Sequence, residues 1–470
     1  MEDTALQGQA DIPRESVNGI QAAPAPPWPR PLYSWYVVGV LLLAYTLSFI
    51  DRMILSLLVT PVRDSLGISD TQFSLLVGMA FALFYTLAGL PLAWIADRFN
   101  RRNLIIGGIG VWSFMTLSCG MAGSYTALFA ARMGVGVGEA TLSPAAYSML
   151  SDYFPKKRLA RAIAVYSIGV PLGSGIALVL GALVIKAILA APEITLPFIG
   201  QTDAWRLTFA FVAFPGILVC LLMLTVREPF RRGRMSVQHT SGSGSQTFIS
   251  HVMTHKVSLG CLFAGMSLIS MVMYGALAWT PAFLSRTYRI SITDAGIWFG
   301  AIMAVCGAGG LVLGGSVADW MFARGYEDGH IRTIRLSILL GGPFLILAPL
   351  MPDSVLALAL LAPGFLFVTM HGVGTVALQV ITPNEYRARI TALYFFVANL
   401  VGLGLGPTLI ALVTDLGFGY DGALRYSLFI VSGIALPVAG LVLTFGMSAY
   451  RRSVASISNL TDPAGEVAMT

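Results

Sequence analysis

The chain has few charged residues. Asp, Glu, Lys and Arg make up 11% of its 470 residues, whereas a soluble globular protein carries about 25%. A soluble chain of this length needs a large charged surface, so the composition excludes almost any soluble enzyme. The 56% hydrophobic content excludes a disordered chain. A mean hydropathy of +0.77 indicates a protein whose surface faces mostly lipid.

Cysteine is also scarce, and its spacing indicates neither a metal site nor a set of disulfide bonds. Four cysteines all fall inside apolar runs, without metal-ligand spacing or a secreted disulfide framework. We therefore expect neither a metal nor a cofactor. The net charge of +6 would suggest nucleic acid on a soluble protein, but a membrane protein carries excess Lys and Arg on its cytoplasmic loops, so no nucleic-acid partner is expected.

What the sequence does contain is a series of long apolar runs, each able to cross a bilayer core of about 30 Å. Backbone groups in lipid must be paired within their own segment, so the runs must be helices. The predicted fold is an all-α membrane protein of twelve transmembrane helices. The predicted spans are 33–59, 71–95, 103–122, 125–152, 162–189, 207–226, 257–284, 293–317, 334–351, 355–381, 389–414 and 424–450.

Polar segments divide the chain. Residues 1–32 are Pro-rich and lack the pattern of a signal peptide, which predicts a flexible tail. Residues 227–256 have a Ser/Gly-rich centre and predict a linker, and residues 451–470 predict a second tail. With the N-terminus inside, 21 of the 29 Lys and Arg residues fall on the cytoplasmic side, six fall outside and two lie within spans. Both termini are therefore predicted to be cytoplasmic.

The two halves of the chain repeat one another. The motif Ala96-Asp97-Arg98 after the second span recurs as Ala318-Asp319-Trp320 after the eighth. A Pro-x4-Ala-Arg-x2-Ala-x-Tyr pattern at 155–166 recurs at 383–394, and a basic residue opens both the sixth and the twelfth spans. We therefore expect two six-helix bundles, 33–226 and 257–450, with a substrate site between them.

One loop carries a family signature. The segment from Ala93 to Arg102 resembles the Asp-Arg-x-Gly-Arg-Arg signature of the major facilitator superfamily, with Ala93 and Asn100 standing where the family usually has Gly. Two further strings, Phe49-Ile-Asp-Arg52 and Arg132-Met-Gly-Val-Gly-Val-Gly-Glu-Ala140, resemble the Spinster family. This resemblance implies a proton-linked carrier of lysolipids or sphingoid lipids, placed in a bacterial inner membrane.

Four ionisable residues lie deep in the predicted spans, all in the first half: Asp51, Arg52, Arg132 and Glu139. Such residues are costly in lipid and are candidates for function. At about 1.5 Å per residue, Asp51 and Arg132 lie at similar depth. Arg132 and Glu139 are two helical turns apart on one face. We expect one polar cluster on the first-half wall of the central cavity.

The residue types suggest roles for this cluster. Glu139 is the favoured proton carrier and Asp51 the next, because burial and a neighbouring Arg act on a carboxyl in opposite directions. Arg52 and Arg132 would hold the carboxylates or bind an anionic headgroup. The alternative is a structural ion-pair network that locks the first span to the fourth.

The cytoplasmic motif predicts a latch. By analogy with the family, Asp97 would pair with Arg161 in the outward-open state, and Asp319 is its counterpart in the second half. The alternative is that these charges only set topology. The latch candidates are Asp97, Arg98, Arg101, Arg102, Arg161 and Asp319.

The second half offers mainly aromatic candidates for the cavity wall. Core or lipid packing is the alternative for each, and His371 is also a candidate for a second proton site. A charged first half and an uncharged second half would suit a ligand with a head and a greasy tail. The cavity candidates are Tyr274, Trp279, His371, Tyr394, Phe395 and Asn399.

These features predict a monomeric secondary carrier for an amphiphilic lipid, with protons and membrane lipids as its other partners. A carrier of a small organic anion or drug is the alternative, because the same arginines would serve it. A sensor built on a transporter scaffold also stays open. The sequence carries no His-Glu-x-x-His and no Gly-x-Ser-x-Gly motif, so we do not expect an enzyme.

Overall fold

The structure is a computed structural model, and it describes residues 27–190, 195–196, 200–201, 203–231, 248–383 and 386–461. This part of the chain is helical apart from one short antiparallel strand pair, β1 (Thr195–Leu196) and β2 (Gly200–Gln201). The helices of the first half are α1 (Pro31–Leu57), α2 (Val59–Leu66), α3 (Asp70–Val77), α4 (Met79–Arg98), α5 (Arg101–Met121), α6 (Tyr125–Glu139), α7 (Leu142–Tyr153), α8 (Lys156–Ser167), α9 (Gly169–Ala190) and α10 (Ala204–Thr225).

The second half follows the same plan but contains three π-helical segments, η1, η4 and η5. Its elements are α11 (Phe248–Thr254), α12 (Lys256–Tyr288), α13 (Ile292–Ile302), η1 (Met303–Gly307), α14 (Ala308–Ala323), α15 (Gly329–Leu347), η2 (Ala348–Leu350), α16 (Ser354–Val368), η3 (Thr369–Val373), α17 (Gly374–Val380), α18 (Arg387–Ala398), η4 (Asn399–Leu405), α19 (Gly406–Leu412), η5 (Val413–Phe418), η6 (Asp421–Ala423) and α20 (Leu424–Thr461).

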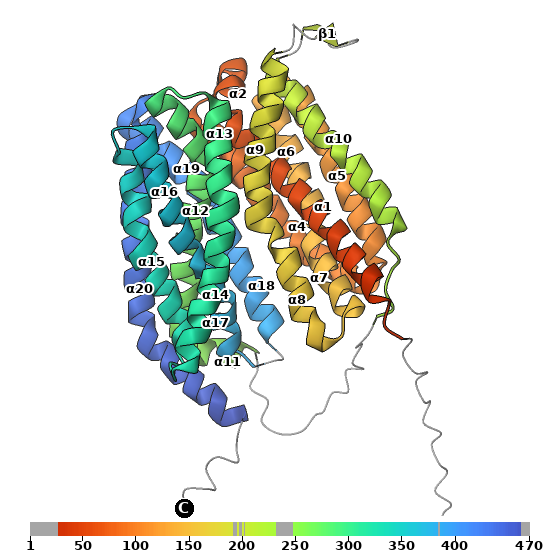
Figure 1. The fold of residues 1–470 in the computed structure, drawn as a ribbon, viewed down its shortest axis with the longest axis vertical. Helices are drawn as coiled ribbons and strands as arrows, with labels where there is room; N and C mark the ends of the chain where they lie inside the picture. Colours follow the sequence, from red (N-terminus) through yellow and green to blue (C-terminus); the bar gives the residue numbers. More distant parts are fainter. Residues whose placement is uncertain are drawn as a thin grey trace, which may run out of the picture.

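The two halves form two bundles that stand side by side (Figure 1). The start of α1 and the ends of α10 and α20 lie at one end of the molecule, here called the terminal end. The helix α2 and the start of α10 lie at the opposite end, here called the far end.

Eleven helical stretches in the described residues are long and apolar enough to cross a membrane. The remaining predicted span, the fourth (125–152), is divided into α6 and α7 by a break at Ala140 and Thr141. Pro144 explains the break, because its ring removes an N–H and clashes with the carbonyl four residues earlier. Large apolar side chains face outward, with Leu416 81% and Phe445 75% exposed. The chain is thus an integral multi-pass membrane protein of the predicted fold class.

The predicted limits at residues 33, 226 and 257 fall within a few residues of helix ends, but the limit at residue 450 does not. The last helix, α20, continues past residue 450 to Thr461, and α11 occupies part of the predicted linker. Residues 1–26, 232–247 and 462–470, which hold most of the predicted tails and the linker's centre, lie outside the described residues. Their role as flexible segments stays a prediction.

Each half is tied together by charges at its terminal end. In the first half, Arg101 donates to Asp152 at 2.6 Å and to Glu228 at 2.7 Å, joining α5 to α7 and to the segment after α10. In the second half, Asp328 before α15 accepts from Arg332 and from Arg451 of α20, both at 2.6 Å.

The two ties differ in burial. Arg101 is 1% exposed, whereas Arg451 is 53% exposed at its side chain. Partial burial disfavours the charged form of Asp328, but its hydrogen bonds to Arg332 and Arg451 outweigh this and hold the pKa of its carboxyl below the usual range.

The bundles meet along α9 against α13 and η1, and along α4 against η4. Glycines allow this close approach. A Cβ on Gly175 would lie 2.6 Å from the Ala304 nitrogen, and a Cβ on Gly78 would lie 2.7 Å from the Leu403 oxygen. These contacts hold the inner faces of the two bundles against each other around the candidate site.

Candidate functional site

The central feature of the first half is a buried ion pair. Arg52 Nε donates to Glu139 Oε2 at 2.6 Å, with side-chain exposures of 9% and 0%. Arg52 lies near the end of α1, and Glu139 is the last residue of α6. The sequence predicted that these two charges share a cluster, and the structure brings them into direct contact.

The helix break places Glu139 at a special backbone position. Because α6 ends at Glu139 and α7 starts at Leu142, the carboxylate stands where regular helix stops. Its second oxygen, Oε1, is buried and has no hydrogen-bond partner among the described residues. Removing the charged partner of a buried carboxylate is strongly destabilising, because the remaining charge is left uncompensated.

Aromatic rings surround the guanidinium of Arg52. Its Cζ lies 4.9 Å from the ring centroid of Phe49, 4.6 Å from Phe81 and 4.9 Å from Tyr85. Rings at this distance stabilise a cation through their quadrupoles, and more so where water is excluded. Arg52 is therefore held by Glu139 and by three rings from α1 and α4.

The second half completes the wall around Arg52. A small cavity there is lined by Arg52, Met53, Ser56, Val77 and Phe81 from the first half and by Tyr274, Ala278, Leu403 and Pro407 from the second. No charged side chain of the second half lines this cavity, which is formed by described residues alone. The site is charged on one side and aromatic or apolar on the other.

Asp51 and Arg132 occupy a neighbouring position. Arg132 Nη1 donates to the main-chain oxygen of Asp51 at 3.3 Å, and Arg132 Nε approaches the Leu76 oxygen at 3.5 Å. The Asp51 side chain is 1% exposed, and its Oδ1 has no hydrogen-bond partner among the described residues. The similar depth predicted for these residues agrees with this contact. The contact runs through the main chain rather than through an ion pair.

The candidates in the second half are placed differently from one another. Trp279 is buried and donates through Nε1 to the Pro407 oxygen at 2.9 Å, so its polar edge is occupied. His371 is half-buried, and its Nδ1 lies 2.8 Å from the Val368 oxygen within its own helical turn. Of the predicted candidates, Tyr274 alone is among the lining residues of the cavity beside Arg52.

The remaining cavity candidates lie on α18 and at the start of η4. Tyr394 is buried and packs its ring 5.7 Å from that of Phe263, whereas Phe395 is 47% exposed. Asn399 is half-buried and is the first residue of η4. A π-helical segment often marks a functional position in a helix, and η4 is the segment that packs against α4.

The motif charges at the terminal end bind within the first half. The main-chain oxygen of Asp97 accepts from Arg231, and Arg98 stacks 3.8 Å from the Trp94 ring. Arg102 donates through its main-chain nitrogen to Glu228 at 3.0 Å. Together with Arg101, these contacts fix the segment that follows α10.

Asp97, Arg161 and Asp319 are exposed side chains in this conformation. No ion pair within 4 Å joins Asp97 to Arg161 in the described part of the chain, and Arg161 lies 5.9 Å from the Trp35 ring. The latch is predicted for the outward-open state, and it stays a prediction.

A second ion network joins the two halves at the far end. Asp70 of α3 is fully buried and accepts from Arg286 of α12 at 2.5 and 2.8 Å, and from Arg63 at 2.9 Å. Arg63 also donates to Asp421 at 2.7 Å. The side-chain hydrogen bonds that join the halves in the described residues cluster at this end.

Sequence reasoning missed this network. The partners that Asp70 and Arg63 have in the second half are 216 and 358 residues away along the chain, and no local spacing reveals such pairs. The rings around Arg52 were missed as well, although Phe49 is its neighbour within one helical turn.

Known proteins provide an independent comparison. A model of the Major Facilitator Superfamily matches residues 41–407. An MFS-type efflux pump of Mycolicibacterium smegmatis is 27% identical over 90% of this chain and 95% of its own length. A probable galactarate/D-glucarate transporter, GudP, of Bacillus subtilis is 24% identical over 83% of this chain and 88% of its own length.

A solved structure matches the whole architecture. It is the crystal structure of a bacterial homologue of the human lysosomal transporter Spinster in an inward-facing, unoccupied conformation. It has a TM-score of 0.73 and 27% identity, and the match covers 91% of this chain and 98% of that one. The matched proteins are transporters rather than enzymes. The family match over residues 41–407, the two paired bundles and the Spinster-like strings around Arg52 and Glu139 agree, and the chain belongs to the Major Facilitator Superfamily of membrane transporters.

Proposed function

We propose that this transporter is a proton-coupled secondary carrier that works by alternating access and moves an amphiphilic lipid such as a lysophospholipid or sphingoid lipid. The observation that carries the proposal is the buried Arg52–Glu139 pair on the wall between the two halves. A charged wall facing an aromatic and apolar wall suits a ligand with a polar head and an apolar tail.

The proposed coupling is a competition for Arg52. A phosphate or carboxylate on the substrate suits the guanidinium and displaces Glu139. An unpaired carboxylate in the interior is costly, so Glu139 takes up a proton as the substrate binds. Asp51, which is also buried, is the second candidate for a proton, and Arg132 holds the main chain on which Asp51 lies.

The proposed conformational cycle uses both ends of the molecule. We take the terminal end as cytoplasmic, in line with the Lys and Arg distribution. The far-end network of Asp70, Arg63 and Arg286 would then close the outer side. In the opposite state, Asp97 and Arg161 would form the latch while the far-end network separates.

A small organic anion or drug is the second candidate substrate. The similarity to GudP and to an efflux pump favours it, because Arg52 would bind a small carboxylate equally well. The two candidates differ in their need for the apolar wall of the second half.

A flux assay separates the candidates. Purified protein in proteoliposomes is given an inward proton gradient and three radiolabelled substrates: a lysophospholipid, a sphingoid base and a dicarboxylate sugar acid. The proposal expects gradient-dependent uptake of the lysophospholipid, whose phosphate can compete with Glu139 for Arg52. The sphingoid base carries an amine and no anionic group, so its uptake alone would contradict this competition. Uptake of the sugar acid alone would favour the second candidate, and uptake of any substrate unaffected by the gradient would contradict proton coupling.

A further inference from the structure

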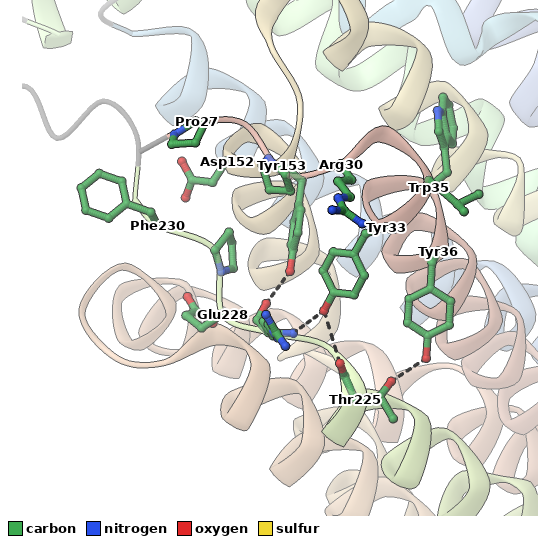
Figure 2. Close-up of a pocket in the computed structure, with 14 residues that line it drawn as sticks. Pro27, Arg30, Tyr33, Trp35, Tyr36, Asp152, Tyr153, Thr225, Glu228 and Phe230 are labelled. Carbon is green, nitrogen blue, oxygen red and sulfur yellow. Dashed lines mark hydrogen bonds between the residues drawn. The ribbon is translucent and has the colours of Figure 1, made fainter. Parts of the chain in front are cut away.

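One cavity in the described residues lies outside the space between the halves. It has a volume of about 1080 Å³ and is lined by the start of α1, the end of α7 and the segment that follows α10. All three belong to the first half, at its terminal end. Figure 2 shows this pocket, with Arg30 beside Tyr33 and with Phe230 on the side opposite Tyr36.

The pocket lies where two membrane spans begin and end. The spans Pro31–Leu57 and Ala204–Thr225 start and finish at its walls. Tyr and Trp side chains gather at the level of lipid headgroups in membrane proteins. Here the lining includes Tyr33, Trp35, Tyr36 and Tyr153, so it has the composition of a membrane interface.

The tyrosines form a fixed wall. Tyr33 Oη donates to the Thr225 oxygen at 3.3 Å and accepts from the Arg227 nitrogen at 2.8 Å. Tyr36 Oη lies 2.5 Å from Thr225 Oγ1, and Tyr153 Oη donates to the Arg227 oxygen. These bonds, marked in Figure 2, join α1 and α7 to the end of α10 and to the residues that follow it.

The charges in the pocket favour an anion. Its two carboxylates, Asp152 and Glu228, are both bound by the buried Arg101 behind the wall. The lining arginines, Arg30 and Arg227, are exposed and make no ion pair within 4 Å in the described part of the chain. Two unpaired guanidinium groups thus face a cavity whose acids are already neutralised.

We propose that this pocket binds the headgroup of an anionic phospholipid, with Arg30 and Arg227 on the phosphate and the aromatic wall along the upper acyl chains. The bilayer supplies the occupant, because the pocket opens at the level where the spans leave the membrane. A bound lipid would join α1, which carries Arg52, to the end of α10. The site is independent of the transported substrate.

The test measures lipid binding to the full chain. Wild-type protein is titrated with phosphatidylglycerol in phosphatidylcholine nanodiscs, and bound lipid is counted by native mass spectrometry. Each basic residue near an anionic membrane surface adds about 1 kcal/mol, so the double variant Arg30→Gln/Arg227→Gln should bind phosphatidylglycerol at least tenfold more weakly. The control Arg324→Gln/Arg452→Gln, which removes two exposed charges outside the pocket, should bind it like wild type.

Three results would overturn the proposal. Equal loss in the control variant would mean that only net charge attracts the lipid. Unchanged binding in the pocket variant would place the lipid elsewhere. Full competition by millimolar inorganic phosphate would indicate a soluble phosphate site instead. Circular dichroism and flux of each variant show that the fold is intact, so a loss of binding reports on the pocket.

Discussion

The two halves share one plan but place their charges differently. Both tie the start of one span to the end of their last span, with the signs exchanged: Arg101 to Glu228 in the first half, Asp328 to Arg451 in the second. In the first half alone, among the described residues, a buried ion pair lines the space between the bundles. The two halves therefore share one architecture, and we propose that the charges of the first half carry the transport chemistry.

This difference explains why a symmetric fold can have a polar side and an apolar side at its centre. A charge inside a membrane span is costly and is retained where it is paired. Arg52 satisfies this condition through Glu139 and three rings, while the facing residues Tyr274 and Ala278 have no charge to pair. From this asymmetry we predict that the first half controls proton coupling and that the second half recognises the apolar tail of the substrate.

The largest effect is expected from removing one partner of the buried Arg52–Glu139 pair in the first half. Arg52→Ala leaves Glu139 buried without its partner, which costs about 3–5 kcal/mol of unfolding free energy. Adding Glu139→Gln to the same chain should recover most of this loss. Denaturation in detergent measures both variants, and a single variant as stable as wild type would show that the pair is not a buried interaction.

The second prediction compares the ion pairs of Arg101 and of Arg451 at the terminal ends of the two halves. Arg101→Ala removes a buried cation from two carboxylates and should cost about 3 kcal/mol or more. Arg451→Ala removes a side chain that is 53% exposed and should cost less than about 1 kcal/mol. Equal losses in the same denaturation assay would mean that burial does not separate the ties.

The third effect concerns the far end, where both halves contribute charges. Asp70→Asn weakens the charged hydrogen bonds to Arg63 and Arg286, each worth about 1.5–3 kcal/mol. The far-end-open population should rise about tenfold. Spin labels at positions 64 and 422 measure the distance between the two halves at the far end. Glu327→Gln is the control at the terminal end. An unchanged distance distribution in Asp70→Asn would argue against a gate.

The smallest effect concerns the apolar wall. Tyr274→Ala should weaken the binding of a lipid with an apolar tail about fivefold, or ~1 kcal/mol, and leave the binding of a small carboxylate unchanged. Trp320→Ala, an aromatic residue that is 52% exposed away from the cavity, is the matched control. Equal weakening of both ligands would mean that Tyr274 contacts the head rather than the tail.

The sequence predicted the fold and the charged residues of the central cluster, because both produce local signals in the sequence. Apolar runs define the spans, and Arg52 and Glu139 stand out because charges are rare in them. The pairing was harder: Arg132 shares a helix with Glu139, yet Arg52, 87 residues away, is its partner. The far-end network and the interfacial pocket depend on contacts between distant segments, which no periodicity reveals.

The central claim is that Glu139 takes up a proton when an anionic group of the substrate binds Arg52. The most direct measurement is the number of protons taken up on substrate binding by purified protein in weakly buffered detergent. Wild type and the exposed control Glu327→Gln should take up about one proton per bound substrate, while Glu139→Gln should still bind substrate and take up none. Undiminished proton uptake by Glu139→Gln would contradict the account and move the proton to another group, with Asp51 the next to test.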